Sequence, residues 1–148
     1  MSRDSYGEIM DEDEIAEFLE NQGIGTLSMG NESGGYGIPM SFGYDRMNDR
    51  CILQLAFAED SLKAEYIEAG NPVTLSTHDW QDMYDWRSVV MHGELRELPP
   101  GEDSLAGGIF AAFSKIASPE VFQRPLPDLD FTWYELRIER VHGRKAER

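Results

Sequence analysis

The sequence lacks any long hydrophobic run and contains a single cysteine, Cys51. One cysteine excludes an internal disulfide and a cluster of thiolate metal ligands. The longest apolar stretches fall far short of the ~20 residues that a membrane-spanning helix needs. The N-terminal residues also lack the apolar segment that is found in signal peptides. We therefore expect a cytoplasmic protein that has no membrane partner.

Basic residues are scarce relative to acidic ones. The chain has 13 Lys and Arg against 28 Asp and Glu, which gives a formal net charge of −15 and a pI near 4.4. Such a surface does not neutralise nucleic-acid phosphates, so nucleic acid is not an expected partner. Because an acidic surface repels itself in dilute buffer and is screened by salt, we expect adaptation to a salt-rich cytosol. An ordinary acidic protein is the alternative.

The length of 148 residues suits one domain, 1–148, with one hydrophobic core. Alternating residue patterns predict six strands, over 25–29, 37–44, 51–58, 73–77, 86–98 and 131–141. Helices are predicted from Asp11 to a stop at Gly23 within the N-terminal segment 1–23, and over 61–69 and 103–118. Residues 79–85 are predicted as a hairpin loop, Gly93 as a bulge and 143–148 as a basic tail. Short connections favour a closed antiparallel β-barrel with flanking helices over a parallel sheet.

Two of these strands have one bulky face and one mostly small face. In the strand 37–44 the small face consists of Gly37, Pro39, Ser41 and Gly43. In the strand 51–58 it consists of Ile52, Gln54, Ala56 and Ala58. The bulky faces are expected in the core, and a small face lets a flat ligand approach the backbone closely.

A candidate phosphate site follows the strand 51–58. The segment 59–63, with sequence EDSLK, begins a predicted helix, and Lys63 is the only lysine in the first 114 residues. Unpaired backbone N–H groups at a helix N-terminus favour an anion, to which Ser61 would add a hydroxyl and Lys63 a charge. The alternative is a solvated Lys63 that pairs with Glu59 or Asp60.

Other familiar functional patterns are missing. His78, His92 and His142 lack the spacing of metal ligands, and Cys51 on an apolar strand face is expected in the core. The sequence has no nucleophile elbow, no P-loop and no dinucleotide-binding glycine motif. Serine hydrolases, Walker-type nucleotide enzymes and Rossmann folds therefore have no support here.

Five segments occur in a characteristic order and spacing: 38–44 (IPMSFGY), 59–63 (EDSLK), 71–73 (NPV), 86–90 (WRSVV) and 143–147 (GRKAE). With them the chain resembles the pyridoxamine 5′-phosphate oxidase-related flavoproteins, most closely the short group that includes nitroimidazole-resistance proteins. The resemblance implies a six-stranded antiparallel split β-barrel that binds FMN and forms a homodimer with the cofactor sites at its interface. Together with the phosphate site, it gives these candidate cofactor-binding residues: Pro39, Met40, Ser41, Phe42, Ala56, Phe57, Ser61, Lys63, Arg87 and Ser88.

The sequence departs from the family pattern at three places. Leu62 stands where the family usually has a second basic residue beside the lysine, and Ala56 replaces the histidine of the nitroimidazole-resistance relatives. The tail 140–144 does not match the one that grips pyridoxal phosphate in vitamin B6 oxidases. We therefore expect no vitamin B6 oxidase activity.

The resemblance implies a flavin-dependent oxidoreductase that acts on an unidentified small molecule. No catalytic acid or base is predicted; Tyr84, Trp86 and Arg87 are candidate substrate contacts only. The alternatives are a non-catalytic flavin- or haem-binding dimeric module, and a barrel that has lost its cofactor. In the haem version the axial ligand would be His78, His92 or His142.

Overall fold

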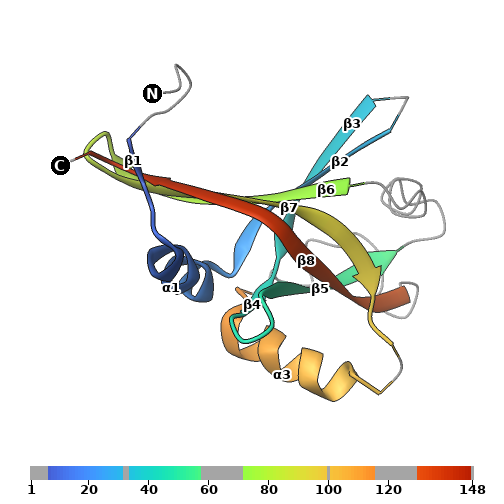
Figure 1. Cartoon of the computed structure of the whole chain (residues 1–148). Helices are drawn as coiled ribbons and strands as arrows, with labels where there is room; N and C mark the ends of the chain where they lie inside the picture. Colours follow the sequence, from blue (N-terminus) through green and yellow to red (C-terminus); the bar gives the residue numbers. More distant parts are fainter. Residues whose placement is uncertain (1–6, 32–33, 58–71, 100, 116–129, 148) are drawn as a thin grey trace.

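The computed structural model describes residues 7–31, 34–57, 72–99, 101–115 and 130–147. Its helices are α1 (Glu12–Gln22) and α3 (Asp103–Phe113) (Figure 1). Its strands are β1 (Glu8–Ile9), β2 (Ile24–Asn31), β3 (Gly34–Ser41), β4 (Gly43–Asp45), β5 (Arg50–Phe57), β6 (Pro72–Asp82), β7 (Asp85–Glu97) and β8 (Asp130–Lys145).

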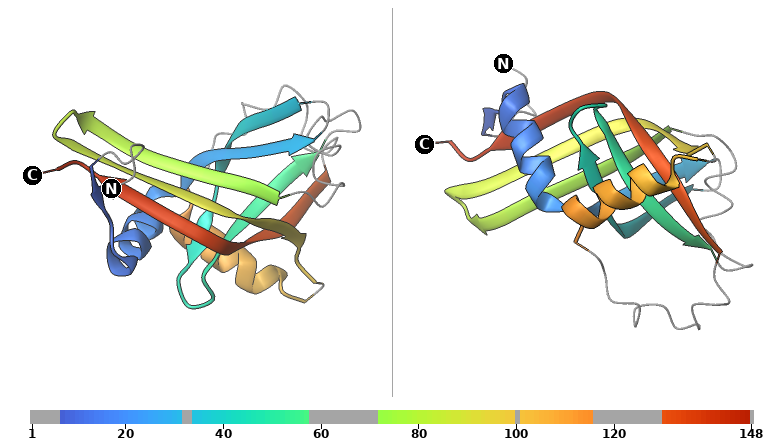
Figure 2. Two further views of the ribbon diagram at one scale, coloured as in Figure 1. Left: turned by 45° about the horizontal axis from the view of Figure 1, so that its top comes forward. Right: turned by 90° about the horizontal axis from the view of Figure 1, so that it is seen from below.

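All strands belong to one antiparallel sheet with the order β3-β2-β6-β7-β8-β5-β4, and β1 pairs with β8. The sheet curls (Figure 2), and its long strand β8 pairs with β5 from Asp130 to Arg137 and with β7 from Tyr134 to Lys145. Its two ends, β3 and β4, are separated in the chain only by Phe42. Consecutive segments of one extended stretch do not pair with each other, so the sheet is not closed. The predicted antiparallel split barrel is confirmed, whereas the expectation of full closure is wrong.

The strand count differs from the predicted six for two reasons. Phe42 divides the predicted strand 37–44 into β3 and β4, and the short strand β1 was not predicted. The predicted bulge at Gly93 is confirmed by a register shift between His92 and Gly93, which leaves Glu139 of β8 unpaired. A Cβ atom at Gly93 would overlap the carbonyl oxygen of Arg137. Glycine is therefore required at this bulge between β7 and β8.

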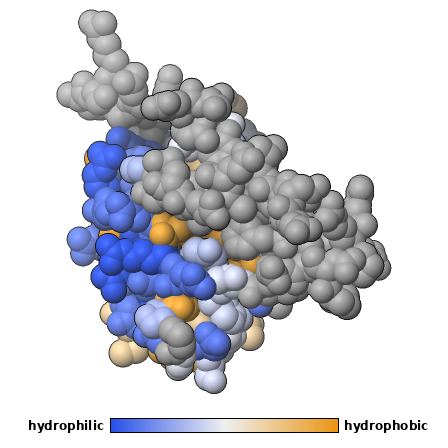
Figure 3. Space-filling view, turned by 90° about the vertical axis from the view of Figure 1, so that its right-hand side faces the viewer, coloured by the Kyte–Doolittle hydropathy of each residue, from blue (hydrophilic) through white to orange (hydrophobic). Residues whose placement is uncertain are grey.

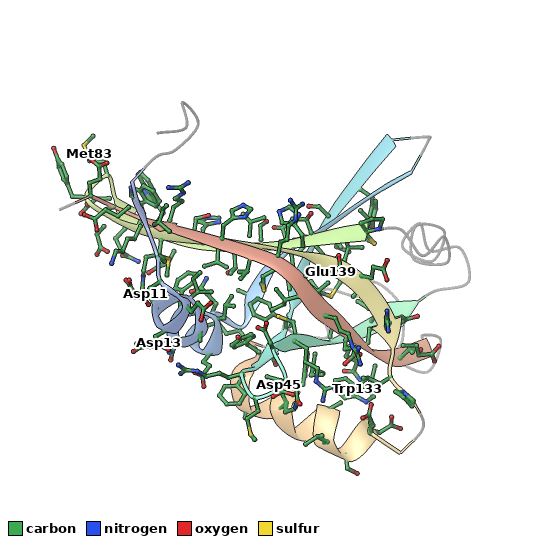
Figure 4. All side chains as sticks on the ribbon, in the orientation of Figure 1. Asp11, Asp13, Asp45, Met83, Trp133 and Glu139 are labelled. Carbon is green, nitrogen blue, oxygen red and sulfur yellow. The ribbon has the colours of Figure 1, made fainter. Side chains whose placement is uncertain are left out.

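Three predicted boundaries need correction. The segment 79–85 is not all loop, because β6 and β7 pair as far as Asp82 and Asp85, with Met83 at the hairpin tip (Figure 4). The tail that begins at Gly143 is strand as far as Lys145, since β8 pairs there with β1 and β7. Helix α3 ends at Phe113, and Ser114 is extended. The predicted helix 61–69 lies outside the described residues.

Helix α1 begins and ends at the residues that the sequence predicts. Asp11 caps the helix by accepting a hydrogen bond from the Glu14 backbone N–H (2.8 Å), and the Glu14 side chain accepts one from the Asp11 backbone N–H. Gly23 ends it with a positive φ of 72°. The predicted start and stop are thereby confirmed, and the helix lays Ile15, Phe18 and Leu19 against the sheet.

The hydrophobic core lies inside the curled sheet. Its fully buried members include Leu27, Leu75, Val89, Met91 and Leu136. The bulky faces predicted for 37–44 and 51–58 contribute to it through Met40, Phe42, Tyr44, Cys51, Leu53 and Leu55. Burial raises the pKa of the Cys51 thiol, which contacts the Met91 sulfur at 3.6 Å. Cys51 is a core residue, as predicted.

The other face of β5 is not open. Ile52 is fully buried beneath α3, with Leu98, Ala106 and Phe110, and Trp133 packs edge-on against Phe110. The prediction of a small ligand-facing surface is therefore wrong at Ile52.

In the view of Figure 3, hydrophilic side chains form a band along one edge of the molecule. Among the described residues, no helix is long and apolar enough to cross a membrane.

Candidate functional site

The strands β3, β2, β6, β7 and β8 lie side by side and form a broad surface with two different faces (Figure 2). Helix α1 covers one face: Arg87 lies 4.8 Å from the Phe18 ring, and Lys145 forms an ion pair with Glu14. A Cβ atom at Gly143 would touch Ile15, which places this end of β8 on the same helix. No described helix lies across the opposite face, which we call the open face.

The open face is built of small, polar and basic side chains. Directly paired residues of antiparallel strands point to the same side of a sheet, so the strand register assigns them. One row runs Gly37, Ser28, Thr74, His92, Arg140, and the next runs Pro39, Thr26, Ser76, Val90, His142. A third row contains Ser41 with Ile24, and His78 with Ser88 and Arg144. No residue in these rows is acidic.

A depression of about 370 Å³ lies at the β6–β7 part of the open face. Trp80 and Trp86, which are paired across the two strands, border it at one end, and Ser76, His78 and Ser88 line the remainder. Thr77, Asp79 and Arg87 also contribute atoms to its lining. The arrangement joins apolar walls to hydroxyl and imidazole groups, which is the usual composition of a small-molecule site.

The predicted residues of β3 are divided between the two faces. Pro39 is exposed on the open face, whereas Met40 and Phe42 are buried in the core. The Ser41 hydroxyl donates a hydrogen bond to the Lys115 carbonyl oxygen at 2.6 Å, so a neighbouring backbone already uses it. Met40 and Phe42 can therefore contact a ligand on the open face through their backbone only.

Arg87 and Ser88 point to opposite sides of β7. Ser88 belongs to the open face. The guanidinium group of Arg87 lies over Phe18 of α1 and 3.7 Å from the Asp79 carboxylate. Ala56 and Phe57 lie in β5, where their backbones pair with Phe131 and Asp130. Ser61 and Lys63, and with them the predicted phosphate site, lie outside the described residues.

The structure brings together basic residues of the tail 140–144, which the sequence analysis set aside as unlike that of the vitamin B6 oxidases. Arg140, His142 and Arg144 occupy alternate positions of β8 on the open face, and the His142 ring lies 5.3 Å from the His92 ring. Burial, followed by the charges of Arg140 and His142, lowers the pKa of His92. The signal was present as two-residue alternation over 140–144, but the predicted strand stopped at 141. Within the described ranges, no three metal-ligating side chains come together.

A second hollow, of about 510 Å³, lies between α3 and the β4–β5 hairpin. Its walls include Arg50, Glu135 and Arg137. Arg50 donates hydrogen bonds to Asp45 (2.9 Å) and Glu135 (2.7 Å), and Arg137 donates one to Glu135 (2.8 Å). Because these charges satisfy one another, the hollow is a weaker ligand site than its size suggests.

A sequence model of the pyridoxamine 5′-phosphate oxidase family matches residues 11–145. This chain belongs to that family. No curated protein matched the sequence.

Solved structures share the fold of this family member. A FAD-binding protein from Mesorhizobium loti aligns with a TM-score of 0.74 and 19% identity, covering 95% of this chain and 98% of that one. A candidate 5-nitroimidazole antibiotic resistance protein from Bacteroides thetaiotaomicron aligns at 0.64 and 16%, covering 92% and 85%. A FAD- and haem-binding protein from Mycobacterium smegmatis aligns at 0.67 and 11%, covering 93% and 72%. At such identities the likeness establishes the fold alone.

Proposed function

We propose that this chain is a cytoplasmic flavoprotein that binds FMN on the open face and acts as a flavin-dependent oxidoreductase on a small molecule. The observation that carries the proposal is the open face itself. Its three rows offer mostly small and polar side chains and no carboxylate, next to a depression of about 370 Å³.

The residues present fit a flavin. Gly37 and Pro39 of β3 let a planar ring approach the backbone closely, and Thr26 and Ser76 offer hydroxyl groups on the neighbouring strands. The absence of carboxylates from the three rows matters because the ring's carbonyl oxygens and the phosphate would be repelled by them. When bound, the flavin supplies the hydride or electron chemistry, while the chain orients it and excludes water.

Family membership and the named ligands of the structural relatives support the flavin class. The Mesorhizobium loti and Mycobacterium smegmatis proteins are both described as FAD-binding. FMN and FAD share the ring and the first phosphate, so a face that accepts the ring suits either of them. Our proposal is FMN, with Lys63 retained as the predicted phosphate ligand.

We also propose that the chain forms a homodimer through part of the open face, with the cofactor sites at the interface. Five strands expose this face, and Ile24 and Ile9 on the same side have exposed fractions of 39% and 71%. A second copy would cover these apolar side chains and enclose the ring. Sedimentation at several protein concentrations measures the assembly; a monomer at all concentrations with FMN bound would contradict it.

A steric substitution tests the site. Ser76 lies in the middle row, so Ser76→Trp should fill the space above the sheet and weaken FMN binding by roughly tenfold or more. Ser104→Trp, on the exposed side of α3, is the matched control and should leave the affinity unchanged. Fluorescence titration measures both. Unaltered FMN affinity in Ser76→Trp would show that the ring binds elsewhere.

Haem binding is a second candidate because of His92 and His142. Their rings lie 5.3 Å apart on the open face, where either imidazole could ligate a haem iron. The Mycobacterium smegmatis relative is described as binding both FAD and haem. A Soret band in the spectrum of the purified protein, lost in His92→Ala or His142→Ala, would favour this reading over the flavin alone.

A further inference from the structure

The open face differs in charge from the rest of the chain. In a protein with a formal net charge of −15, its three rows contain no acidic residue. They do contain Arg140, His142 and Arg144 at alternate positions of β8, with His92 beside them on β7. Basic groups are therefore concentrated on one edge of the face proposed to hold a ligand.

These arginines also differ from most of the other basic residues in their partners. Except for Lys115, the other described basic side chains form ion pairs: Arg46 with Asp13 and Glu20, Arg50 with Asp45 and Glu135, Arg87 with Asp79, Arg96 with Glu94, Arg137 with Glu135, and Lys145 with Glu14. Neither Arg140 nor Arg144 forms an ion pair within the part of the chain that the structure describes. Their guanidinium groups are therefore available to an anionic ligand.

The carboxylates nearest to this group lie at the bulge. Glu94 follows Gly93 on β7, and its carboxylate lies 3.8 Å from the Arg96 guanidinium. Glu139 is the unpaired residue of the bulge and is exposed, near the bend of β8 (Figure 4). Glu94 pairs with Pro72, which alternates with Thr74, so its carboxylate lies on the open face beside the Arg140 end of the basic group.

We propose that Arg140, His142 and Arg144, with His92, form a site for a phosphate or diphosphate group of the ligand. Guanidinium groups match phosphate oxygens with paired N–H donors, and protonated imidazoles add further donors. The site deepens the proposed flavin function and rests on it. The phosphate belongs either to the bound flavin or to a separate phosphorylated substrate.

Inorganic pyrophosphate is the direct probe, titrated calorimetrically into the full-length protein. The double variant Arg140→Gln/Arg144→Gln should weaken its binding by about tenfold to a hundredfold, since two charge-assisted contacts are lost. Arg46→Gln/Arg96→Gln removes two exposed arginines elsewhere, with the same change in net charge, and should stay within about twofold of the wild type. Pyrophosphate that does not bind the wild type, or binds both double variants equally, would overturn the site.

Two further titrations identify the source of the phosphate. If it is the flavin's, FMN should block pyrophosphate, and the Arg140/Arg144 variant should lose FMN affinity while riboflavin binds as before. If it is a separate substrate's, the FMN-loaded protein should still bind pyrophosphate. Pyrophosphate binding without any flavin binding would keep the anion site and remove the flavin proposal. A variant that changes only the oligomeric state would assign the arginines to subunit contacts and overturn the site.

His92 gives the site an expected pH dependence. The pKa of His92 is lowered by burial and by the charges of Arg140 and His142, and Glu94 and Glu139 are the acidic residues at the adjoining bulge. Affinity for inorganic sulfate, whose charge is constant in this range, should therefore rise as the pH falls below about 6.5. His92→Gln should flatten that rise, and an unchanged pH profile would exclude the His92 imidazole from the site.

Discussion

Glu135 holds two arginines at once. One of its oxygens accepts a hydrogen bond from Arg50 and the other from Arg137, while Arg50 is also bound by Asp45. Asp45, Arg50 and Glu135 are all buried. Glu135→Ala leaves the Arg50 charge with one partner and should lower the free energy of unfolding by about 3 kcal/mol. Urea denaturation measures the change, and exposed Glu139→Ala is the control. Equal effects of the two substitutions would contradict the importance of this cluster.

The same cluster predicts how stability responds to acid. Burial alone would raise the pKa of both carboxyl groups. Hydrogen bonds from Arg50 and Arg137 outweigh burial at Glu135 and lower its pKa. Hydrogen bonds from Asn48 and Arg50 do the same for Asp45. The unfolded chain therefore takes up protons first as the pH falls. The stabilisation is complete above the unfolded pKa of about 4 and is lost below it. Unfolding followed between pH 7 and 3 should show this loss, and Glu135→Gln should reduce its slope; a parallel slope would contradict the assignment.

The element that shapes the sheet is the bulge between β7 and β8. Because a Cβ atom at Gly93 would overlap the Arg137 carbonyl, Gly93→Ala should destabilise the protein by at least about 2 kcal/mol. Gly108 in α3 has open space around its Cβ position, so Gly108→Ala should instead stabilise by up to about 1 kcal/mol through helix propensity. Thermal unfolding of the two variants should give shifts of opposite sign. Shifts of the same sign would show that the bulge tolerates a side chain.

Elements with local signals were predictable from the sequence. Asp11 and Gly23 bound α1 through a capping hydrogen bond and a positive φ, which are properties of the residues themselves. The bulky face of β3 was predictable by alternation, because residues 38 and 40 alternate with Gly37 and Pro39.

What was missed depends on contacts between distant segments. Ile52 lies beneath α3, which no pattern within β5 reveals. Strand β8 continues past Val141 because it pairs there with β1 and β7, and α1 covers Gly143 and Lys145 from one side, as the closeness of Ile15 and Glu14 shows. The three rows of the open face become visible only when five strands are placed in register.

At the scale of the whole molecule, the net charge of −15 dominates the expected solution behaviour. Its self-repulsion is screened by salt, so the melting temperature should rise between dilute buffer and molar salt. Calorimetry in potassium chloride measures this, with sucrose as a control for effects that do not depend on charge. An unchanged melting temperature would contradict adaptation to a salt-rich cytosol.

The central claim is that the open face binds a flavin. The most direct measurement is the absorbance spectrum of the freshly purified protein, followed by titration with FMN. The account predicts oxidised-flavin bands, or their perturbation when FMN is added to protein that has lost its cofactor. A colourless protein whose addition leaves the FMN spectrum and fluorescence unchanged would contradict it.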